Sequence, residues 1–297
     1  MRIGAILPTA GPLPLELGVV AMAQAAADAG AAGLWVGDHL VLPQQTVHNY
    51  PYSPDGRLAW DPERDYLEAL TTCAYIAGAV QSGCTVGTAV LVLPQRNVLQ
   101  TAKEVATIDR LTGGRLQLGL GAGWNDVEMA ALGYRFATRG RRFDEMLVVL
   151  RDAWQGRTSG FKGTEIDVPA SLGLFPRPAH PDGPPLLVGG NSPASLRRAA
   201  QLADGWLALA AVDTWDAEQL RTGIADLRAG WDAAGRPGDP RAVLKLHCPE
   251  VALPHLARRV AETAELGFDE VAVELPWHRG IDDAAGVLDG LTSTRRP

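Results

Sequence analysis

The fold is decided by residues 97–124, which read NVLQTAKEVATIDRLTGGRLQLGLGAGW. Residues 97–111 are predicted to form a helix that ends before the pair Gly113-Gly114, because glycine adopts the left-handed conformation of a helix C-terminus at little cost. Residues 115–120 follow as an apolar run of strand length and lead into a second glycine cluster. This stretch therefore predicts a helix, a strand and a loop of small residues at the carboxyl end of that strand.

The same alternation of strands and helices extends along the rest of the chain. Strands are predicted at residues 2–7, 34–37, 85–93, 115–120, 185–188, 206–210, 243–248 and 270–275. A glycine marks several junctions between a helix and the next strand, as in residues 32–35 (AGLW), 204–206 (DGW) and 266–268 (LGF). Nearly every strand precedes a helix, and eight such units in 297 residues favour one α/β fold, a (β/α)8 TIM barrel, over a doubly wound sheet.

Two irregular segments interrupt this alternation. Residues 40–64, after the second strand, are rich in Pro, Tyr, Asn and Gly and long enough to form an active-site lid. Residues 156–184, after the fourth strand, are rich in proline, and the alternation resumes unchanged beyond them. We therefore expect a single barrel domain over residues 1–297, with insertions after strands 2 and 4.

Composition excludes several classes of protein. A hydrophobic content of 46% is enough for a sizeable core, and 27 basic against 34 acidic residues, without a dense basic cluster, argues against nucleic acid as a partner. The 3 cysteines are widely spaced and form no C-x-x-C pair, which disfavours disulfides and cysteine-bound zinc. The N-terminal apolar run is too short for a signal peptide, and no apolar run is long enough to span a membrane. These features predict a cytoplasmic protein with no membrane association.

In a parallel barrel the active site lies where the strands end and the loops to the helices begin. Four places satisfy this rule: Asp38-His39 after strand 2, residues 91–96 after strand 3, residues 121–125 after strand 4 and residues 189–192 after strand 5.

Among these places, the loop Gly189-Gly190-Asn191-Ser192-Pro193 has the clearest interpretation in terms of ligand binding. Two glycines allow the backbone to approach a ligand, while Ser192 is suited to cap the following helix and Pro193 to occupy its first position. A helix N-terminus with Arg197 and Arg198 in its next turn is suited to binding phosphate. An ordinary capped helix after a tight turn explains the same residues, and the sequence alone leaves both interpretations open.

The glycines after strand 4 are a weaker signal for a nucleotide. Gly119, Gly121 and Gly123 have the spacing G-x-G-x-G, whereas dinucleotide-binding folds use G-x-G-x-x-G followed by a ribose-binding acid. The alternative is a loop in which the small residues Gly121, Ala122 and Gly123 let a flat ring system lie against the backbone.

Asp38 and His39 are candidate catalytic residues because of their position at a strand end. His39 is suited to general acid–base catalysis with a carboxylate that orients it, although a structural histidine is also possible there. The other histidines have no metal-ligand spacing, so no metal site is predicted. Thr88 lies in the apolar run of strand 3, and on the sequence alone it is better explained as a core threonine.

These motifs together resemble the bacterial luciferase-like monooxygenase superfamily, and within it the actinobacterial group of coenzyme F420-dependent oxidoreductases. The matching stretches are residues 33–39 (GLWVGDH), 86–97 (VGTAVLVLPQRN), 102–124 (from AKE through DRLTGGR to GLGAGW), 188–200 (VGGNSP with RAA) and 203–206 (ADGW).

The resemblance implies a barrel that binds F420 or FMN at the carboxyl ends of its strands, usually as a homodimer. It implies that a bulge after strand 3, mapped to residues 87–89 and so to Gly87 and Thr88, supports the cofactor ring, and that Gly121, Ala122 and Gly123 lie near the ring. It assigns the phosphate to Gly189, Gly190, Asn191 and Ser192. Asp38 and His39 match a pair that serves the substrate side of the ring in F420-dependent dehydrogenases. Trp124 stands where those dehydrogenases have a glutamate, which leaves His39 as the only obvious proton-transfer group.

We therefore expect an oxidoreductase that uses F420 to transfer a hydride to or from a small or medium organic substrate. The alternative within enzymes is an FMNH2-dependent monooxygenase that uses O2 and a separate reductase. A non-catalytic protein that kept the barrel and lost the cofactor is disfavoured, because the glycines at 121, 123, 189 and 190 are intact. The sequence does not identify the substrate. The aromatic residues of the predicted lid, Tyr50, Tyr52 and Trp60, indicate only that the substrate is partly apolar.

Overall fold

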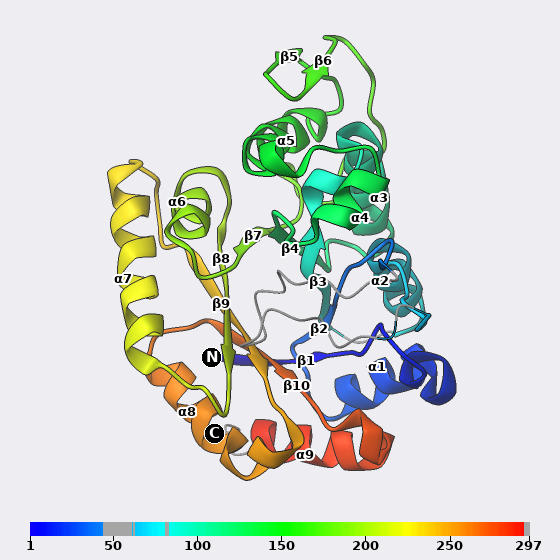
Figure 1. The fold of residues 1–297 in the computed structure, drawn as a ribbon, viewed down its shortest axis with the longest axis vertical. Helices are drawn as coiled ribbons and strands as arrows, with labels where there is room; N and C mark the ends of the chain where they lie inside the picture. Colours follow the sequence, from blue (N-terminus) through cyan, green and yellow to red (C-terminus); the bar gives the residue numbers. More distant parts are fainter. Residues whose placement is uncertain (44–60, 62, 81–82, 294–297) are drawn as a thin grey trace.

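The structure is a computed structural model that describes residues 1–43, 61, 63–80 and 83–293. Eight parallel strands close into a barrel in the order β1-β10-β9-β8-β7-β4-β3-β2 (Figure 1). These strands are β1 (Arg2–Ile6), β2 (Gly33–Val36), β3 (Thr85–Val92), β4 (Leu116–Gly121), β7 (Leu186–Gly189), β8 (Gly205–Ala211), β9 (Arg241–His247) and β10 (Glu270–Glu274). The predicted (β/α)8 barrel is confirmed.

Helices cover the outside of the barrel (Figure 1). They are α1 (Val19–Asp28), α2 (Ala69–Ala79), α3 (Val98–Leu111), α4 (Asp126–Ala131), α5 (Arg139–Ala153), α6 (Pro193–Leu202), α7 (Ala217–Ala233), α8 (Leu256–Glu265) and α9 (Ile281–Ser293). Short helical turns also occur, at Pro14–Gly18, Leu93–Gln95, Phe136–Thr138, Glu250–His255 and Trp277–Arg279. Side chains cap the N-termini of several helices. At the start of α3, for example, Asn97 accepts hydrogen bonds from the Leu99 and Gln100 amides.

Among the described residues, no helix combines the length and the apolar character needed to cross a membrane.

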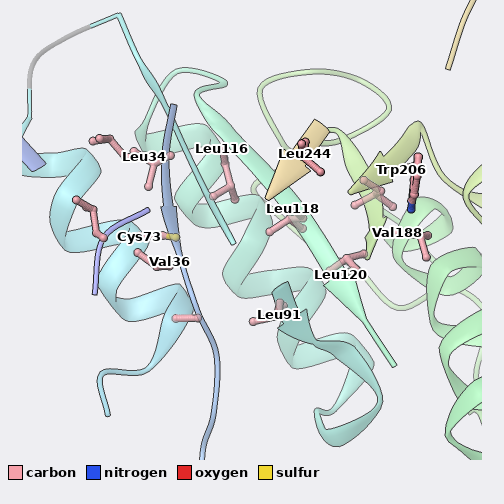
Figure 2. Close-up of a cluster of buried hydrophobic side chains, with 14 of the residues drawn as sticks. Leu34, Val36, Cys73, Leu91, Leu116, Leu118, Leu120, Val188, Trp206 and Leu244 are labelled. Atoms are coloured by element: carbon pink, nitrogen blue, oxygen red, sulfur yellow. The ribbon is translucent and has the colours of Figure 1, made fainter. Parts of the chain in front are cut away.

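The core has two separate parts because side chains alternate between the two faces of each strand. Outward-facing residues such as Leu118, Leu120 and Val188 pack against the helices (Figure 2). Inward-facing residues form a smaller apolar layer inside the barrel: Ile6, Trp35, Ala89, Leu187, Leu207, Val243 and Ala272, each from a different strand. This inner layer closes the barrel, so that any ligand site must lie above it, at the carboxyl ends of the strands.

Strand β3 is irregular where it reaches that end. Its register with β4 shifts between Thr88 and Leu91, and the peptide bond between Ala89 and Val90 is cis. The resemblance placed this bulge at residues 87–89, whereas it lies one to two residues further along the chain. Gly87 and Thr88 therefore precede the bulge.

The two predicted insertions differ in what the structure describes. Most of the predicted lid, residues 44–60 and 62 with Tyr50, Tyr52 and Trp60, lies outside the described residues. Between α5 and β7, the strands β5 (Phe161–Lys162) and β6 (Asp167–Val168) form an antiparallel pair that is separate from the barrel.

Candidate active site

Asp38 follows β2 at the mouth of the barrel and is bound on both carboxylate oxygens. Its Oδ2 accepts a hydrogen bond from the Val92 amide at 2.9 Å, and its Oδ1 accepts one from Nη2 of Arg96 at 2.7 Å. The same Arg96 nitrogen also donates to Oε1 of Glu68, at 2.8 Å. Burial raises the pKa of Asp38 above its ordinary value, against the Arg96 charge that lowers it. Asp38 therefore ties β2 to the end of β3 and does not orient His39.

The carboxylate that orients His39 is Glu128, on the first turn of α4. Nδ1 of His39 lies 2.7 Å from Oε2 of Glu128, and both side chains are buried. The other oxygen of Glu128 accepts from the amides of Leu40, at 2.6 Å, and Val41, at 3.2 Å. Burial raises the pKa of Glu128, but the hydrogen bond and charge of His39 and these amides outweigh it, so the net pKa is lowered. An ionised Glu128 requires the Nδ1–H tautomer of His39, which makes Nε2 the basic nitrogen.

Two aromatic side chains hold the His39 ring edge to face. The ring centroid of Tyr66 lies 5.3 Å from that of His39, and the centroid of Trp124 lies 5.7 Å away, with interplanar angles of 80° and 74°. Burial raises the pKa of Tyr66 to about 12, so the phenol stays protonated. Trp124 thus contacts one side of His39, and Glu128, four residues further along the chain, supplies the carboxylate.

Val90, at the β3 bulge, forms an apolar surface at the centre of the mouth. A β-carbon at Gly121 would lie 2.6 Å from Cγ2 of Val90, and one at Gly189 would lie 2.5 Å from Cγ1. The two glycines on β4 and β7 therefore leave room for the isopropyl group, which packs on the inner apolar layer of the barrel. This packing is a structural reason for glycine at both positions.

The turn after β7 leads directly into the ten-residue helix α6. Gly190 has a φ of 104°, a conformation that side chains rarely adopt, and its carbonyl accepts from Nε1 of Trp206 at 2.8 Å. Ser192 caps α6 by accepting from the Ser195 amide at 3.1 Å. Asn191 holds the turn to β8, since its side-chain amide both donates to and accepts from the backbone of Leu209.

Two guanidinium groups converge between the loops after β4 and β7. Nε of Arg139 donates to the carbonyl of Gly123 at 3.1 Å, which joins α5 to the glycine loop. Burial lowers the pKa of Arg139, and the charge of nearby Arg198 lowers it further. Arg198, on α6, is paired with Asp144. Arg139 is therefore tied to the loop after β4, and Arg198 joins α6 to α5 through its pair with Asp144.

The other predicted residues divide between the mouth and the strand interior. Ala122 and Gly123 lie partly buried in the loop after β4. Thr88 is fully buried and donates to the carbonyl of Gly119 at 2.8 Å, and the position of a Gly87 β-carbon is taken by Gln117. Gly87 and Thr88 therefore lie below the mouth, in the packing between β3 and β4.

Among the described residues, no group of three or more His, Cys, Asp or Glu side chains is placed to hold a metal ion.

The sequence reasoning missed Glu128, although a local signal was present. Asn125 and Glu128 have the N-x-x-E spacing of a capped helix N-terminus, and Oδ1 of Asn125 does accept from the Glu128 amide at 3.1 Å. The signal predicts a short helix after the strand 4 glycines and hence a carboxylate at the barrel mouth.

The structure is thus a parallel (β/α)8 barrel with a buried histidine–carboxylate pair at its mouth, and comparisons with known proteins identify the family. The sequence model of the luciferase-like monooxygenase family matches residues 1–287. The chain therefore belongs to the luciferase-like monooxygenase family, a family of oxidoreductases.

Relatives in sequence agree with this membership, and solved structures share the fold. A protein of Mycobacterium tuberculosis is 34% identical over 188 residues, which are 63% of this chain and 64% of that protein, so the match spans less than two thirds of the relative. An F420-dependent hydroxymycolic acid dehydrogenase of the same organism is 32% identical over 80% of this chain and 63% of its own length. An F420-dependent secondary alcohol dehydrogenase in complex with an F420–acetone adduct superposes with a TM-score of 0.77 at 16% identity, over 98% of each chain. The FMN complex of the oxygenating component of 3,6-diketocamphane monooxygenase from Pseudomonas putida superposes with a TM-score of 0.73 at 15% identity, over 99% of this chain and 97% of that one. At these identities the structural matches bear on the fold alone.

Proposed function

We propose that this protein is an F420-dependent oxidoreductase that interconverts an alcohol and a carbonyl compound. The observation that carries the proposal is the hydrogen bond of 2.7 Å between His39 and Glu128 at the barrel mouth. Alcohol oxidation releases one hydride and one proton, and a buried histidine held by a carboxylate is suited to take that proton.

The residues present fit a deazaflavin cofactor. Gly189, Gly190, Asn191 and Ser192 at the start of α6 would hold the phosphate, and Val90, with Gly121 and Gly189 on either side, would support the ring. The glycine loop with Ala122 and Gly123 would border the ring on the β4 side. Gly87 and Thr88, which lie below the mouth, would support the ring indirectly, through the packing of β3. When bound, F420 supplies or accepts the hydride.

The chain's own residues handle the proton and exclude water. Nε2 of His39 takes the proton of a substrate hydroxyl during oxidation and returns it to the carbonyl oxygen during reduction. Glu128 keeps the imidazole in the correct tautomer and stabilises the imidazolium that forms. Tyr66 and Trp124 restrict the ring and keep the pair in an apolar environment, in which its electrostatic interactions are stronger. Asp38, through Arg96, fixes the loop that carries His39.

The experiment that tests this proposal is a titration of the purified protein with three ligands in one buffer. The ligands are oxidised F420, its tail-less precursor without phosphate, and FMN, with binding followed by fluorescence. We expect F420 to bind most tightly, and the F420-loaded protein then to be screened with secondary alcohols and ketones. Tight binding of FMN without detectable binding of either deazaflavin would overturn the proposal in favour of an FMNH2-dependent monooxygenase. Hydride transfer by F420 that is unchanged after removal of the His39 imidazole would overturn the assigned proton path.

A further inference from the structure

Strand β9 carries a charged side chain inside the barrel that the proposed reaction does not use. Lys245 lies on the same face of β9 as Val243, a member of the inner apolar layer. Its Nζ donates to the carbonyl oxygen of Ala89 at 2.9 Å. Ala89 belongs to β3, and in the closed barrel β3 and β9 are separated by three strands in either direction. The lysine side chain therefore crosses the barrel from one wall to the opposite wall.

The carbonyl that Lys245 holds belongs to the bulge of β3. The register between β3 and β4 shifts between Thr88 and Leu91, so the segment around Ala89 and Val90 lacks the regular ladder to β4. Val90 follows Ala89 directly and is the side chain that lies between Gly121 and Gly189. A cross-barrel contact at Ala89 thus replaces part of the hydrogen bonding that the bulge gives up, next to the apolar surface at the centre of the mouth.

Two further ionisable side chains at the ends of β9 and β10 adjoin this contact. His247 ends β9 and Glu274 ends β10, and the two side chains form an ion pair. Burial lowers the pKa of Lys245, and the charge of Glu274 acts against that shift. The hydrogen bond to the Ala89 carbonyl and the charge of Glu274 therefore offset part of the cost of burying the Lys245 ammonium group.

We propose that Lys245 is a positioning residue for the cofactor ring. Lys245 holds the Ala89 carbonyl from the opposite wall and so fixes the bulge of β3. The bulge in turn sets the position of the Val90 side chain, on which the ring rests. This inference rests on the proposed function, since it assumes a flavin or deazaflavin ring at the mouth. Its effect is confined to the ring, because the phosphate turn after β7 is held by separate contacts through Asn191 and Ser192.

The test compares Lys245→Met with wild type and with Lys162→Met, which removes an exposed lysine on β5 far from the mouth. Methionine has a similar length but cannot donate to Ala89. In the protein without cofactor, we expect amides 88–92 of the variant to exchange hydrogen for deuterium at least tenfold faster. With cofactor, we expect the dissociation constants of F420, its phosphate-free precursor and FMN to rise by a similar factor of about tenfold, because all three share a ring.

The two readouts separate this inference from the proposed function. A wild-type protein that binds none of the three ligands would defeat the proposed function, while the exchange data would still decide whether Lys245 holds the bulge. Unchanged exchange at 88–92, or ring affinities within twofold of wild type, would overturn the inference. A loss restricted to the ligands that carry phosphate would also overturn it. If Lys245→Met fails to fold, Lys245→Leu, which also lacks a hydrogen-bond donor, gives the same comparison.

Discussion

His39 and Glu128 together show how one side chain sets the chemistry of another. Glu128 accepts backbone hydrogen bonds with one oxygen and approaches Nδ1 of His39 with the other, so its carboxylate is held in place before any ligand binds. A histidine whose Nδ1 proton is committed in this way presents Nε2 as a base, which is the arrangement that general base catalysis requires.

Replacing His39 should therefore abolish proton transfer and leave the cofactor site intact. We expect His39→Ala to lower turnover by roughly 10²–10⁴-fold on the alcohol or ketone found by screening wild type, with the F420 dissociation constant nearly unchanged. His180→Ala, at an exposed histidine, is the matched control. If the melting temperature of His39→Ala collapses while the activity of each folded molecule stays normal, His39 is a structural residue.

Glu128→Gln tests the tautomer directly, because glutamine preserves shape but is able to donate to Nδ1. Such a contact would favour the tautomer with a proton on Nε2, which cannot act as a base. We expect turnover to fall by about 10²-fold or more, with normal F420 affinity. Asp126→Asn, on the exposed side of the same helical turn, should leave turnover unchanged. Equal activity of Glu128→Gln and wild type would show that the carboxylate does not set the tautomer.

The lowered pKa of Glu128 also predicts how stability depends on pH. A carboxylate whose folded-state pKa lies below its ordinary value of 4.5 stabilises the folded state above that value, and this contribution is lost as the pH falls through the folded-state pKa. We expect the difference in melting temperature between wild type and Glu128→Gln to be greatest near pH 7 and to shrink below pH 4.5. A difference that stays constant between pH 7 and pH 3 would contradict this assignment.

At the scale of elements, the strands were predictable from their apolar runs, whereas only its N-terminal cap indicated the short helix α4. A long apolar run such as residues 85–93 can be recognised because burial on both faces of a parallel strand leaves few polar residues. Helix α4 spans only Asp126–Ala131, which is too short for an apolar period to emerge. Because Glu128 lies on α4, the missed helix and the missed carboxylate are one error.

The side-chain partners within the site were harder to predict than the positions of the loops. Asp38 and His39 are adjacent in the sequence, yet their side chains bind Arg96 and Glu128, which lie 58 and 89 residues away. The rule that loops after parallel strands meet at one end placed Asp38, His39 and Arg96 at the mouth, but it did not include Glu128. Which carboxylate faces which base depends on side-chain packing across strands, and a single sequence carries little information about that.

The turn between β7 and α6 gives a prediction at this scale. The φ of 104° at Gly190 excludes a branched side chain without a shift of the turn. We expect Gly190→Val to raise the dissociation constants of F420 and FMN at least tenfold and to leave the phosphate-free precursor nearly unaffected, as measured by fluorescence titration. Gly235→Val controls for the backbone cost, because Gly235 also has a positive φ, of 66°, at the far end of α7. Equal losses for all three ligands would show that the turn does not bind the phosphate.

At the scale of the whole molecule, the two ends of the barrel have different roles. The mouth carries the site, whereas the opposite end carries a buried charge cluster around Glu270, the first residue of β10. Glu270 accepts from Nε1 of Trp35 on β2 at 2.8 Å, and it pairs with Arg241 on β9 at 2.7 Å and with Arg2 on β1 at 3.0 Å. One carboxylate thus connects four strands, including β1 and β10, whose pairing joins the two ends of the chain to close the barrel.

Loss of the Glu270 charge should destabilise the whole barrel without touching the chemistry. Glu270→Gln leaves the guanidinium of Arg241, which is mostly buried, without its partner, and breaking a buried ion pair in this way typically costs about 3 kcal/mol. Denaturant unfolding should therefore show a lower midpoint with an unchanged slope, and the folded variant should bind F420 as wild type does. Glu218→Gln, which disrupts an exposed ion pair with Arg221, should change stability by less than about 1 kcal/mol. If Glu270→Gln is as stable as wild type, the strand ladder and the apolar layers close the barrel without this charge cluster. If the variant loses much of its F420 affinity, the two ends of the barrel are coupled.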